Sequence, residues 1–318
     1  MGTYAVTGGA GFIGSHLTDA LLARGHVVRV LDDLSTGKLA NLDRRCEVLR
    51  GDVCDTALLT RLISGVDGCF HLAAVASVAR GNEDWTGTSR VNLAGTVAVL
   101  DAARGAGRVP VVYASSAAVY GTLHGVAAED AVPVPRTAYG ADKLASELHA
   151  RVGALVHGVP SVGFRFFNVY GPRQDPASPY SGVISIFARA IGAGQGVSVH
   201  GDGLQTRDFV FVEDVVAHLQ AGMRVAQTQA GSHVLNVCTG RETSILDLAS
   251  AIAGLCGRAP LVRHGPARDG DISRSVGSPA RATALLRVQA GISLLQGLRE
   301  TLHSLGADVS AKATDEAA

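Results

Sequence analysis

A tyrosine and a lysine placed four residues apart are the side chains of this chain best suited to move a proton. Tyr139 and Lys143 fall at the start of a predicted helix, residues 138–157, so they share one helix face. A free tyrosine hydroxyl, with a pKa of about 10, is a poor base at neutral pH. A cation held beside it stabilises the phenolate and lowers that pKa. The pair therefore predicts a tyrosine that removes a proton from a substrate hydroxyl, with Lys143 as the supporting cation.

Ser116 is the third candidate because it follows a predicted strand, residues 109–114. In a parallel α/β sheet, ligands bind at the carboxyl ends of the strands. From that edge the Ser116 hydroxyl could hydrogen-bond the same substrate oxygen as Tyr139. A Tyr-x-x-x-Lys spacing often arises by chance, so its interpretation depends on the elements that position it.

Three glycines near the N-terminus are spaced for a dinucleotide. Gly8, Gly11 and Gly14 lie between a predicted strand, residues 3–7, and a predicted helix, residues 12–24. Glycine lets the backbone come close to a pyrophosphate, and the N–H groups at a helix start point at that anion. A glycine-rich turn alone is weak evidence, but between a strand and a helix it predicts a bound dinucleotide.

An acidic pair after the second predicted strand, residues 27–31, indicates which dinucleotide binds. Asp32 could accept hydrogen bonds from both hydroxyls of the adenosine ribose and would repel a 2′-phosphate. With Asp33 beside it, this residue favours NAD over NADP. Lys38, in the following loop, could meet a 2′-phosphate, so the preference is not absolute. The positively charged nicotinamide of NAD would also stabilise a tyrosine phenolate.

Strands and helices alternate through the first half of the chain. The predicted strands are residues 3–7, 27–31, 46–50, 68–72, 109–114 and 161–167, and the predicted helices are residues 12–24, 56–64, 88–106 and 138–157. This alternation predicts an α/β fold: a doubly wound parallel sheet of the Rossmann type, with helices on both faces.

The alternation changes after residue 168. The later predicted elements are a helix near 182–194, a short strand pair at 197–200 and 208–212, a helix at 213–227 and a strand at 233–237. We expect an NAD-binding domain over residues 1–168, which residues 208–238 rejoin. A smaller, interleaved α/β substrate domain is expected over residues 169–305, and residues 306–318, small and polar, are expected to be a disordered tail.

The composition excludes several partner classes. The 318 residues carry 28 basic and 28 acidic side chains, so nothing favours a nucleic acid or an anionic membrane as partner. The five cysteines form no C-x-x-C pair and the histidines show no metal-ligand spacing, so neither a disulfide framework nor a metal site is predicted. Without a bilayer-length apolar run or the basic start of a signal peptide, the protein is expected to be soluble and cytoplasmic.

These motifs together resemble the extended short-chain dehydrogenase/reductases, specifically the NAD-dependent nucleotide-sugar epimerase/dehydratase group. The resemblance runs from Thr3 to about Leu302 and implies NAD as cofactor and Ser116, Tyr139 and Lys143 as catalytic residues. Asp52 and Val53 would flank the adenine. The full set of implied cofactor contacts is Gly8, Gly11, Phe12, Ile13, Gly14, Asp32, Asp33, Asp52, Val53, Ala73, Asn92, Tyr139 and Lys143.

The same resemblance implies a site for a nucleotide-sugar diphosphate. Asn168 matches an asparagine that contacts the diphosphate, and Arg207 and Arg268 match arginines that neutralise it. Forked guanidinium donors suit paired phosphate oxygens. Asp271 would order the nucleotide ribose or Arg268, and Ser116 would contact the sugar.

The residues after Ser116 favour one reaction of this group. The 4,6-dehydratases carry an Asp-Glu pair there and the decarboxylases a nearby Glu, whereas Ala117 and Ala118 follow here. A UDP-hexose 4-epimerase needs no such carboxylate: Tyr139 takes the C4 hydroxyl proton, NAD takes the C4 hydride, and a transient 4-keto sugar turns over before both return. The alternatives are a UDP-hexosamine 5,6-dehydratase, a UDP-glucuronate 4-epimerase and a non-catalytic NAD-binding sensor.

Ser275 is a candidate for the residue that sets substrate size. Aligned on Gly270 and Asp271, it occupies a position that is bulky in epimerases restricted to plain hexoses. A small residue admits an N-acetyl group, so UDP-GlcNAc and UDP-GalNAc are expected as substrates beside UDP-glucose and UDP-galactose. Members of the group usually form homodimers through two long helices, which here would be residues 88–106 and 138–157.

Overall fold

The computed structural model describes residues 1–122, 125–175, 182–267 and 272–309. Its centre is a sheet ordered β11-β6-β5-β4-β1-β2-β3, in which every neighbouring pair is parallel. The doubly wound α/β fold is confirmed, and residues 233–237 join this sheet as predicted. The strands are β1 (Thr3–Thr7), β2 (Val27–Asp32), β3 (Glu47–Arg50), β4 (Gly68–His71), β5 (Val111–Ser116), β6 (Ser161–Phe166) and β11 (Ser232–Val237).

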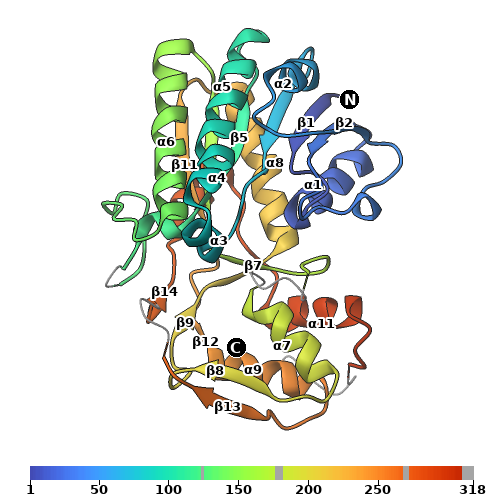
Figure 1. Ribbon diagram of the computed structural model, residues 1–318, viewed down its shortest axis with the longest axis vertical. Coiled ribbons are helices and arrows are strands. Elements are labelled where there is room, and N and C mark those ends of the chain that lie inside the picture. Colours follow the sequence, from blue (N-terminus) through green and yellow to red (C-terminus); the bar gives the residue numbers. More distant parts are fainter. Residues whose placement is uncertain (123–124, 176–181, 268–271, 310–318) are drawn as a thin grey trace.

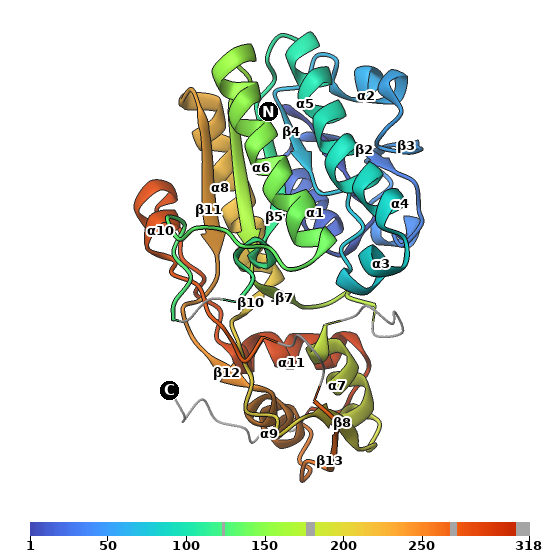
Figure 2. The same ribbon diagram turned by 60° about the vertical axis from the view of Figure 1, so that its left-hand side comes forward.

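Helices cover both faces of the sheet (Figures 1 and 2). One face carries α1 (Phe12–Ala23), α8 (Val212–Thr228) and α10 (Ala280–Leu286), and the other carries α2 (Thr56–Ile63), α5 (Gly95–Gly105) and α6 (Ala138–His157). Each face has its own apolar cluster. Successive residues of a strand alternate between the two, so Val112 packs in the first cluster and Val111 and Tyr113 in the second.

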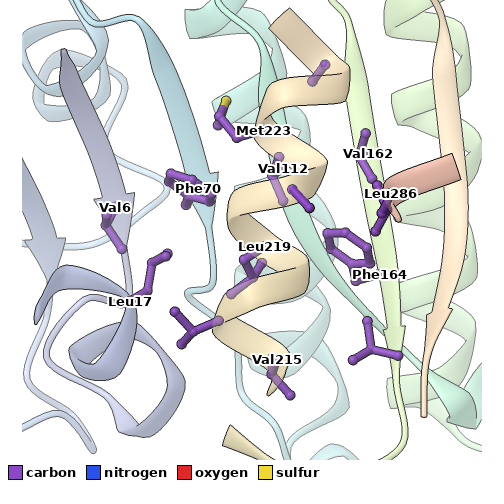
Figure 3. Packing of buried hydrophobic residues seen from close by; sticks show 14 of the residues in the cluster. Val6, Leu17, Phe70, Val112, Val162, Phe164, Val215, Leu219, Met223 and Leu286 are labelled. Carbon is purple, nitrogen blue, oxygen red and sulfur yellow. The ribbon is translucent and has the colours of Figure 1, made fainter. Parts of the chain in front are cut away.

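Helix α8 lies at the centre of the first cluster (Figure 3). Val215, Leu219 and Met223 are four residues apart and buried, so they form one apolar helix face. In the cluster they join Phe70 of β4 and Val112 of β5. This packing holds a late segment of the chain against the sheet. It thereby fixes the strand that immediately precedes α8 near the functional edge.

α3 (Val78–Glu83) and the short helical turns Leu39–Asn41 and Ala117–Tyr120 belong to the segments around the sheet. Most elements after β6 group below the sheet in Figure 1. They are β7 (Asn168–Tyr170), α7 (Val183–Gly192), β8 (Val197–His200), β9 (Thr206–Arg207), β10 (Phe209–Phe211), β12 (Thr243–Ser244), α9 (Ile245–Leu255), β13 (Val262–Gly265), β14 (Arg274–Ser275) and α11 (Leu294–Ser304). Phe187, Leu248 and Leu298, from the three helices, belong to a separate apolar core. The division into domains at residue 168 stays a prediction.

The predicted pairing of residues 197–200 with residues 208–212 is wrong. β8 pairs in parallel with β13, and β10 pairs in parallel with β7. The composition of a short apolar segment indicates that it is a strand, but it does not indicate which strand it pairs with. Pairing depends on which distant segments the fold brings together. The β7–β10 pairing sets Asn168 beside Phe209, directly after Arg207 and Asp208 in the chain.

The single helix predicted over residues 88–106 is interrupted. α4 (Trp85–Ser89) leads into a π-helical turn, Arg90–Ala94, before α5 begins. Such turns often occur at functional positions. This one holds Asn92, whose side chain accepts from the backbone nitrogen of Val75 at 2.8 Å and donates to its carbonyl at 3.2 Å. The widened turn therefore fixes the loop that follows β4.

Among the helices of the described ranges, none is long and apolar enough to cross a membrane. In the same part of the chain, no group of three or more His, Cys, Asp or Glu side chains is arranged to hold a metal ion.

Candidate active site

The glycine turn forms one wall of a cavity of about 460 Å³, the first cavity. Gly8 has a φ of +69°, and a Cβ there would lie 2.7 Å from the backbone nitrogen of Ala73. A Cβ on Gly14 would lie 2.1 Å from the carbonyl oxygen of Gly8. Only glycine fits at these two positions. No side chain caps the start of α1 at Gly11, so its first N–H groups remain available to an anion such as a pyrophosphate.

Asp32 ends β2 and lines the same cavity. Its carboxylate is buried and accepts hydrogen bonds from the backbone nitrogens of Ala10 and Leu34, each at 2.9 Å. Burial raises the pKa of Asp32, and the two hydrogen bonds oppose that shift. The carboxylate is thus fixed where it could accept ribose hydroxyls. Lys38, which could have met a 2′-phosphate, forms an ion pair with Asp175 at 3.0 Å.

Nearly all of the predicted cofactor residues converge on this cavity. Those that line it are Gly8, Gly11, Phe12, Ile13, Gly14, Asp32, Asp33, Asp52, Val53, Ala73, Tyr139 and Lys143. Asn92 is the exception: it is fully buried, is not part of the lining and holds Val75 in the loop behind it. Its position supports the wall of the cavity rather than direct contact with a cofactor.

The three predicted catalytic residues come from two elements. Ser116 is the last residue of β5, and Tyr139 and Lys143 lie on the first turns of α6. The hydroxyl of Thr137 caps this helix by accepting from the backbone nitrogen of Gly140 at 3.0 Å. The Lys143 Nζ atom lies 5.8 Å from the centroid of the Tyr139 ring and donates to the carbonyl of Ala114 at 2.8 Å.

The protonation of this group differs from the sequence expectation. Burial raises the pKa of Tyr139, and a hydrogen bond with Ser116 opposes that shift. The sequence predicted that Lys143 lowers the pKa of Tyr139, but Lys143 is not among the groups of the chain that shift this pKa. Burial lowers the pKa of Lys143 to about 8, against the charges of Asp142 and Glu147. Lys143 thus keeps its positive charge below about pH 8. The groups of the chain by themselves leave Tyr139 a neutral phenol at neutral pH.

A second cavity of about 210 Å³ adjoins the first and shares Ser116, Phe166, Phe167 and Asn168 with it. Four predicted substrate residues line it: Ser116, Asn168, Arg207 and Ser275. β9 and β14 pair in parallel, which places Ser275 opposite Arg207. The backbone nitrogen of Asn168 donates to the carbonyl of Asp208 at 3.0 Å. Residues far apart in the chain therefore meet around one space beside the catalytic group.

Arg207 is positioned by its neighbour. The buried carboxylate of Asp208 accepts hydrogen bonds from the backbone nitrogens of Thr239 (2.8 Å), Gly240 (2.9 Å) and Gly277 (3.3 Å), and from the Thr239 hydroxyl (2.7 Å). This set joins three loops next to Arg207. The Arg207 guanidinium in turn donates to the carbonyl of Ile272 at 2.6 Å.

Arg274 is a lining residue of the second cavity that sequence reasoning did not select. It forms an ion pair with Glu242, whose carboxylate also accepts from the Thr206 hydroxyl at 2.9 Å. In the sequence, the position of Arg274 directly before Ser275 was the signal that could have identified it as a residue of the substrate site. The predicted substrate residues Arg268 and Asp271 lie outside the described residues.

The chain is similar to known enzymes along most of its length. A model of the NAD dependent epimerase/dehydratase family matches residues 4–238. A UDP-glucose 4-epimerase of Mycolicibacterium smegmatis is 40% identical over 307 residues, covering 94% of this chain and 96% of that protein. The structure of UDP-glucose 4-epimerase from Thermotoga maritima with UDP-glucose has a TM-score of 0.90 at 33% identity, over 96% of this chain and 98% of that one. UDP-N-acetylglucosamine 4-epimerase from Methanobrevibacter ruminantium, in complex with UDP-N-acetylmuramic acid, has a TM-score of 0.89 at 31% identity, over 95% and 97%.

Proposed function

The chain belongs to the NAD-dependent epimerase/dehydratase family, and we propose that it is a UDP-hexose 4-epimerase. The residues that line the second cavity are the main support for an epimerase over the other enzymes of the family. Its described lining contains Ser116, Asn168 and two arginines, but no Asp or Glu. Elimination of water or loss of carbon dioxide would need a further acid or base there. The site is instead equipped to exchange one proton and one hydride at a single carbon.

NAD, the cofactor of the family, fits the first cavity. The turn at Gly8 and Gly14 permits close approach of a pyrophosphate, the start of α1 offers N–H donors, and Asp32 offers a ribose acceptor. When bound, NAD supplies the acceptor and donor for the hydride at C4 of the sugar. Because the hydride returns in each cycle, the cofactor has no need to leave.

Tyr139 is the proposed proton acceptor. As a phenolate, its oxygen would take the proton of the C4 hydroxyl, and the hydroxyl formed in that step would return the proton after the 4-keto sugar has presented its other face. Ser116, which hydrogen-bonds to Tyr139, holds the same substrate oxygen in line. Lys143, held against the Ala114 carbonyl, keeps a positive charge beside Tyr139 and so stabilises the phenolate that accepts the proton. The positively charged nicotinamide of bound NAD would add to this effect.

Arg207 and Asn168 are proposed to hold the diphosphate of the UDP-sugar. Both side chains line the second cavity, and a guanidinium and an amide together provide several donors for diphosphate oxygens. The same lining contains the small residues Ala117, Ala118 and Gly121. Anchoring by the diphosphate leaves the sugar free to turn, which 4-epimerisation requires.

Product analysis tests this function. Incubated with UDP-glucose and no added cofactor, the enzyme is expected to form UDP-galactose, observed by the change in the C4 proton coupling in NMR. A keto or unsaturated product would indicate a dehydratase instead, and turnover restricted to UDP-glucuronate would indicate a uronate epimerase. No turnover of any UDP- or dTDP-sugar would favour an NAD-binding sensor.

Ser275 is proposed to admit N-acetylated sugars, since its small side chain lines the second cavity opposite Arg207. The UDP-N-acetylglucosamine 4-epimerase among the similar structures supports this substrate range.

Replacing Ser275 by Tyr is expected to lower kcat/KM for UDP-GlcNAc by at least about 10-fold, through a clash with the N-acetyl group. Activity on UDP-glucose should change much less. Ser275→Ala, equally small, should retain both activities. Equal losses on both sugars in the Tyr variant would contradict the assignment.

A homodimer through α5 and α6 is also proposed. The two helices lie side by side in both ribbon views (Figures 1 and 2). Leu148, Val152, Leu155 and Val156 of α6 are 56%, 49%, 74% and 69% exposed, and their spacing places them on one helix face. An apolar stripe of this kind on a surface helix is typical of a protein interface.

Light scattering tests the dimer. The protein is expected to have twice the 32.6 kDa mass of one chain. Leu155→Glu should shift the mass towards one chain, because it places a charge within the proposed contact. Leu261→Glu, at an exposed leucine outside α6, is the matched control. A monomeric wild-type protein, or an unaltered mass in the Leu155 variant, would count against this interface.

A further inference from the structure

A tight turn contributes one residue to the lining of the first cavity. Residues 171–175, here called the strap, begin with a turn closed by a hydrogen bond from the Gln174 nitrogen to the Gly171 carbonyl, at 3.4 Å. Pro172 occupies the second position, and Arg173 has a φ of +67° at the third. Both features belong to a type II turn, whose third position normally requires glycine or asparagine. A strained non-glycine residue of this kind often occurs at a ligand clamp.

Three contacts tie the strap to the walls of the first cavity. The His16 Nε2 atom donates to the Pro172 carbonyl at 2.9 Å, and Arg173 forms an ion pair with Asp19 at 2.6 Å. Both partners lie on α1, the helix that follows the glycine turn. On the other side Asp175 pairs with Lys38, in the loop after Asp32. The strap is thus attached to two segments that surround the cofactor cavity.

Gln174 is the strap residue that lines the cavity. Its side-chain nitrogen donates to the carbonyl of Val169 at 3.2 Å, which fixes the orientation of the amide. The other end, Oε1, is buried and has no hydrogen-bond partner. A buried acceptor without a donor costs stability unless a ligand supplies the donor.

We infer that Gln174 is a cofactor-binding residue whose amide oxygen accepts a hydrogen bond from the nicotinamide riboside half of NAD. An amide oxygen can only accept, so it cannot pair with the pyrophosphate. Its anchor, Val169, directly follows Asn168, which lines both cavities beside Ser116. Donors at that end of the dinucleotide are the carboxamide NH₂ and the ribose hydroxyls. The inference rests on NAD binding and not on the proposed reaction.

Release of cofactor from the loaded protein tests this role. Wild-type protein and Gln174→Met, each loaded with labelled NAD, are diluted into excess unlabelled NAD. The variant is expected to release NAD about 3- to 10-fold faster, the effect of one neutral hydrogen bond. Gln205→Met is the matched control, because that half-buried amide also donates to a backbone carbonyl but lines neither cavity. It should release NAD at the wild-type rate.

Two analogues identify the donor. The first analogue, 3-acetylpyridine adenine dinucleotide, lacks the carboxamide NH₂. If this NH₂ is the donor, wild type and Gln174→Met should release the analogue at the same rate. If a ribose hydroxyl is the donor, this analogue and ADP-ribose should both leave the variant faster. Gln174→Ala provides a second variant with the same expected behaviour.

Equal NAD release from wild type and both variants, with a raised KM for the UDP-sugar, would overturn the inference and assign Gln174 to the sugar site. Wild-type products other than a 4-epimer would refute the proposed reaction and leave this result intact.

Discussion

Replacing Tyr139 by phenylalanine is expected to lower kcat by about 10²- to 10⁴-fold, the range associated with loss of a positioned acid–base group. The substitution removes only the hydroxyl that hydrogen-bonds to Ser116. The ring can keep its place beside Lys143, 5.8 Å from the Nζ atom. NAD should remain bound, because the glycine turn and Asp32 are unchanged. The expected result is thus a loaded but nearly inactive protein.

Initial rates on UDP-glucose and the NAD content of the purified protein measure the two parts of this prediction. Tyr4→Phe is the control, since Tyr4 lies near the start of β1, at the opposite end of that strand from the glycine turn. It should retain both activity and cofactor. An active Tyr139→Phe protein would refute the assignment of the proton acceptor. An inactive one that has lost NAD would point to a structural role for the hydroxyl.

Replacing Arg165 by methionine is expected to reduce the free energy of unfolding by about 3–5 kcal/mol, the usual cost of leaving a buried charge unpaired. Arg165 of β6 donates to both carboxylate oxygens of Glu147, at 2.9 and 2.7 Å, and each side chain is only 6% exposed. The Ser115 hydroxyl also donates to Glu147. The pair therefore joins α6, which carries Tyr139, to the strands beneath it.

Urea denaturation measures this effect. The double variant Arg165→Met, Glu147→Leu is expected to recover much of the loss, because it removes both charges of the pair and leaves neither of them without its partner. Arg104→Met is the matched control: it breaks the exposed pair with Asp101 and should cost less than about 1 kcal/mol. A loss below about 1 kcal/mol in Arg165→Met would show that water or another group compensates Glu147.

Features encoded by neighbouring residues were predictable from the sequence. The glycine spacing predicted the turn before α1. The close approach of Gly14 to the Gly8 carbonyl involves only residues that are near one another in the chain. The limits of α6 were predicted correctly, and the structure shows the local reason: Thr137 caps its start, and Gly158, at a φ of +69°, follows its end. The period of four placed Tyr139 and Lys143 on one face.

Features that depend on distant segments were not predictable. Nothing local marks β13 as the partner of β8, or β7 as the partner of β10. The π-helical turn holds Asn92, whose side chain binds Val75 in a loop 17 residues earlier in the chain, a contact that no local pattern marks. The raised pKa of Tyr139 results from burial, which the spacing of two residues does not report.

By itself, the sequence predicted the parallel α/β fold, the glycine turn before α1 and the placement of Tyr139 and Lys143 on one helix face, because the patterns behind them lie within single elements or between neighbours in the chain. Only the tertiary structure decided that Ser116, Asn168, Arg207 and Ser275 share one cavity. It also revealed the buried Arg165–Glu147 pair and the unpartnered amide of Gln174. The physical reason is the strand order: a sheet brings together the ends of strands that are far apart in the chain, and that order is set by the packing of the whole molecule.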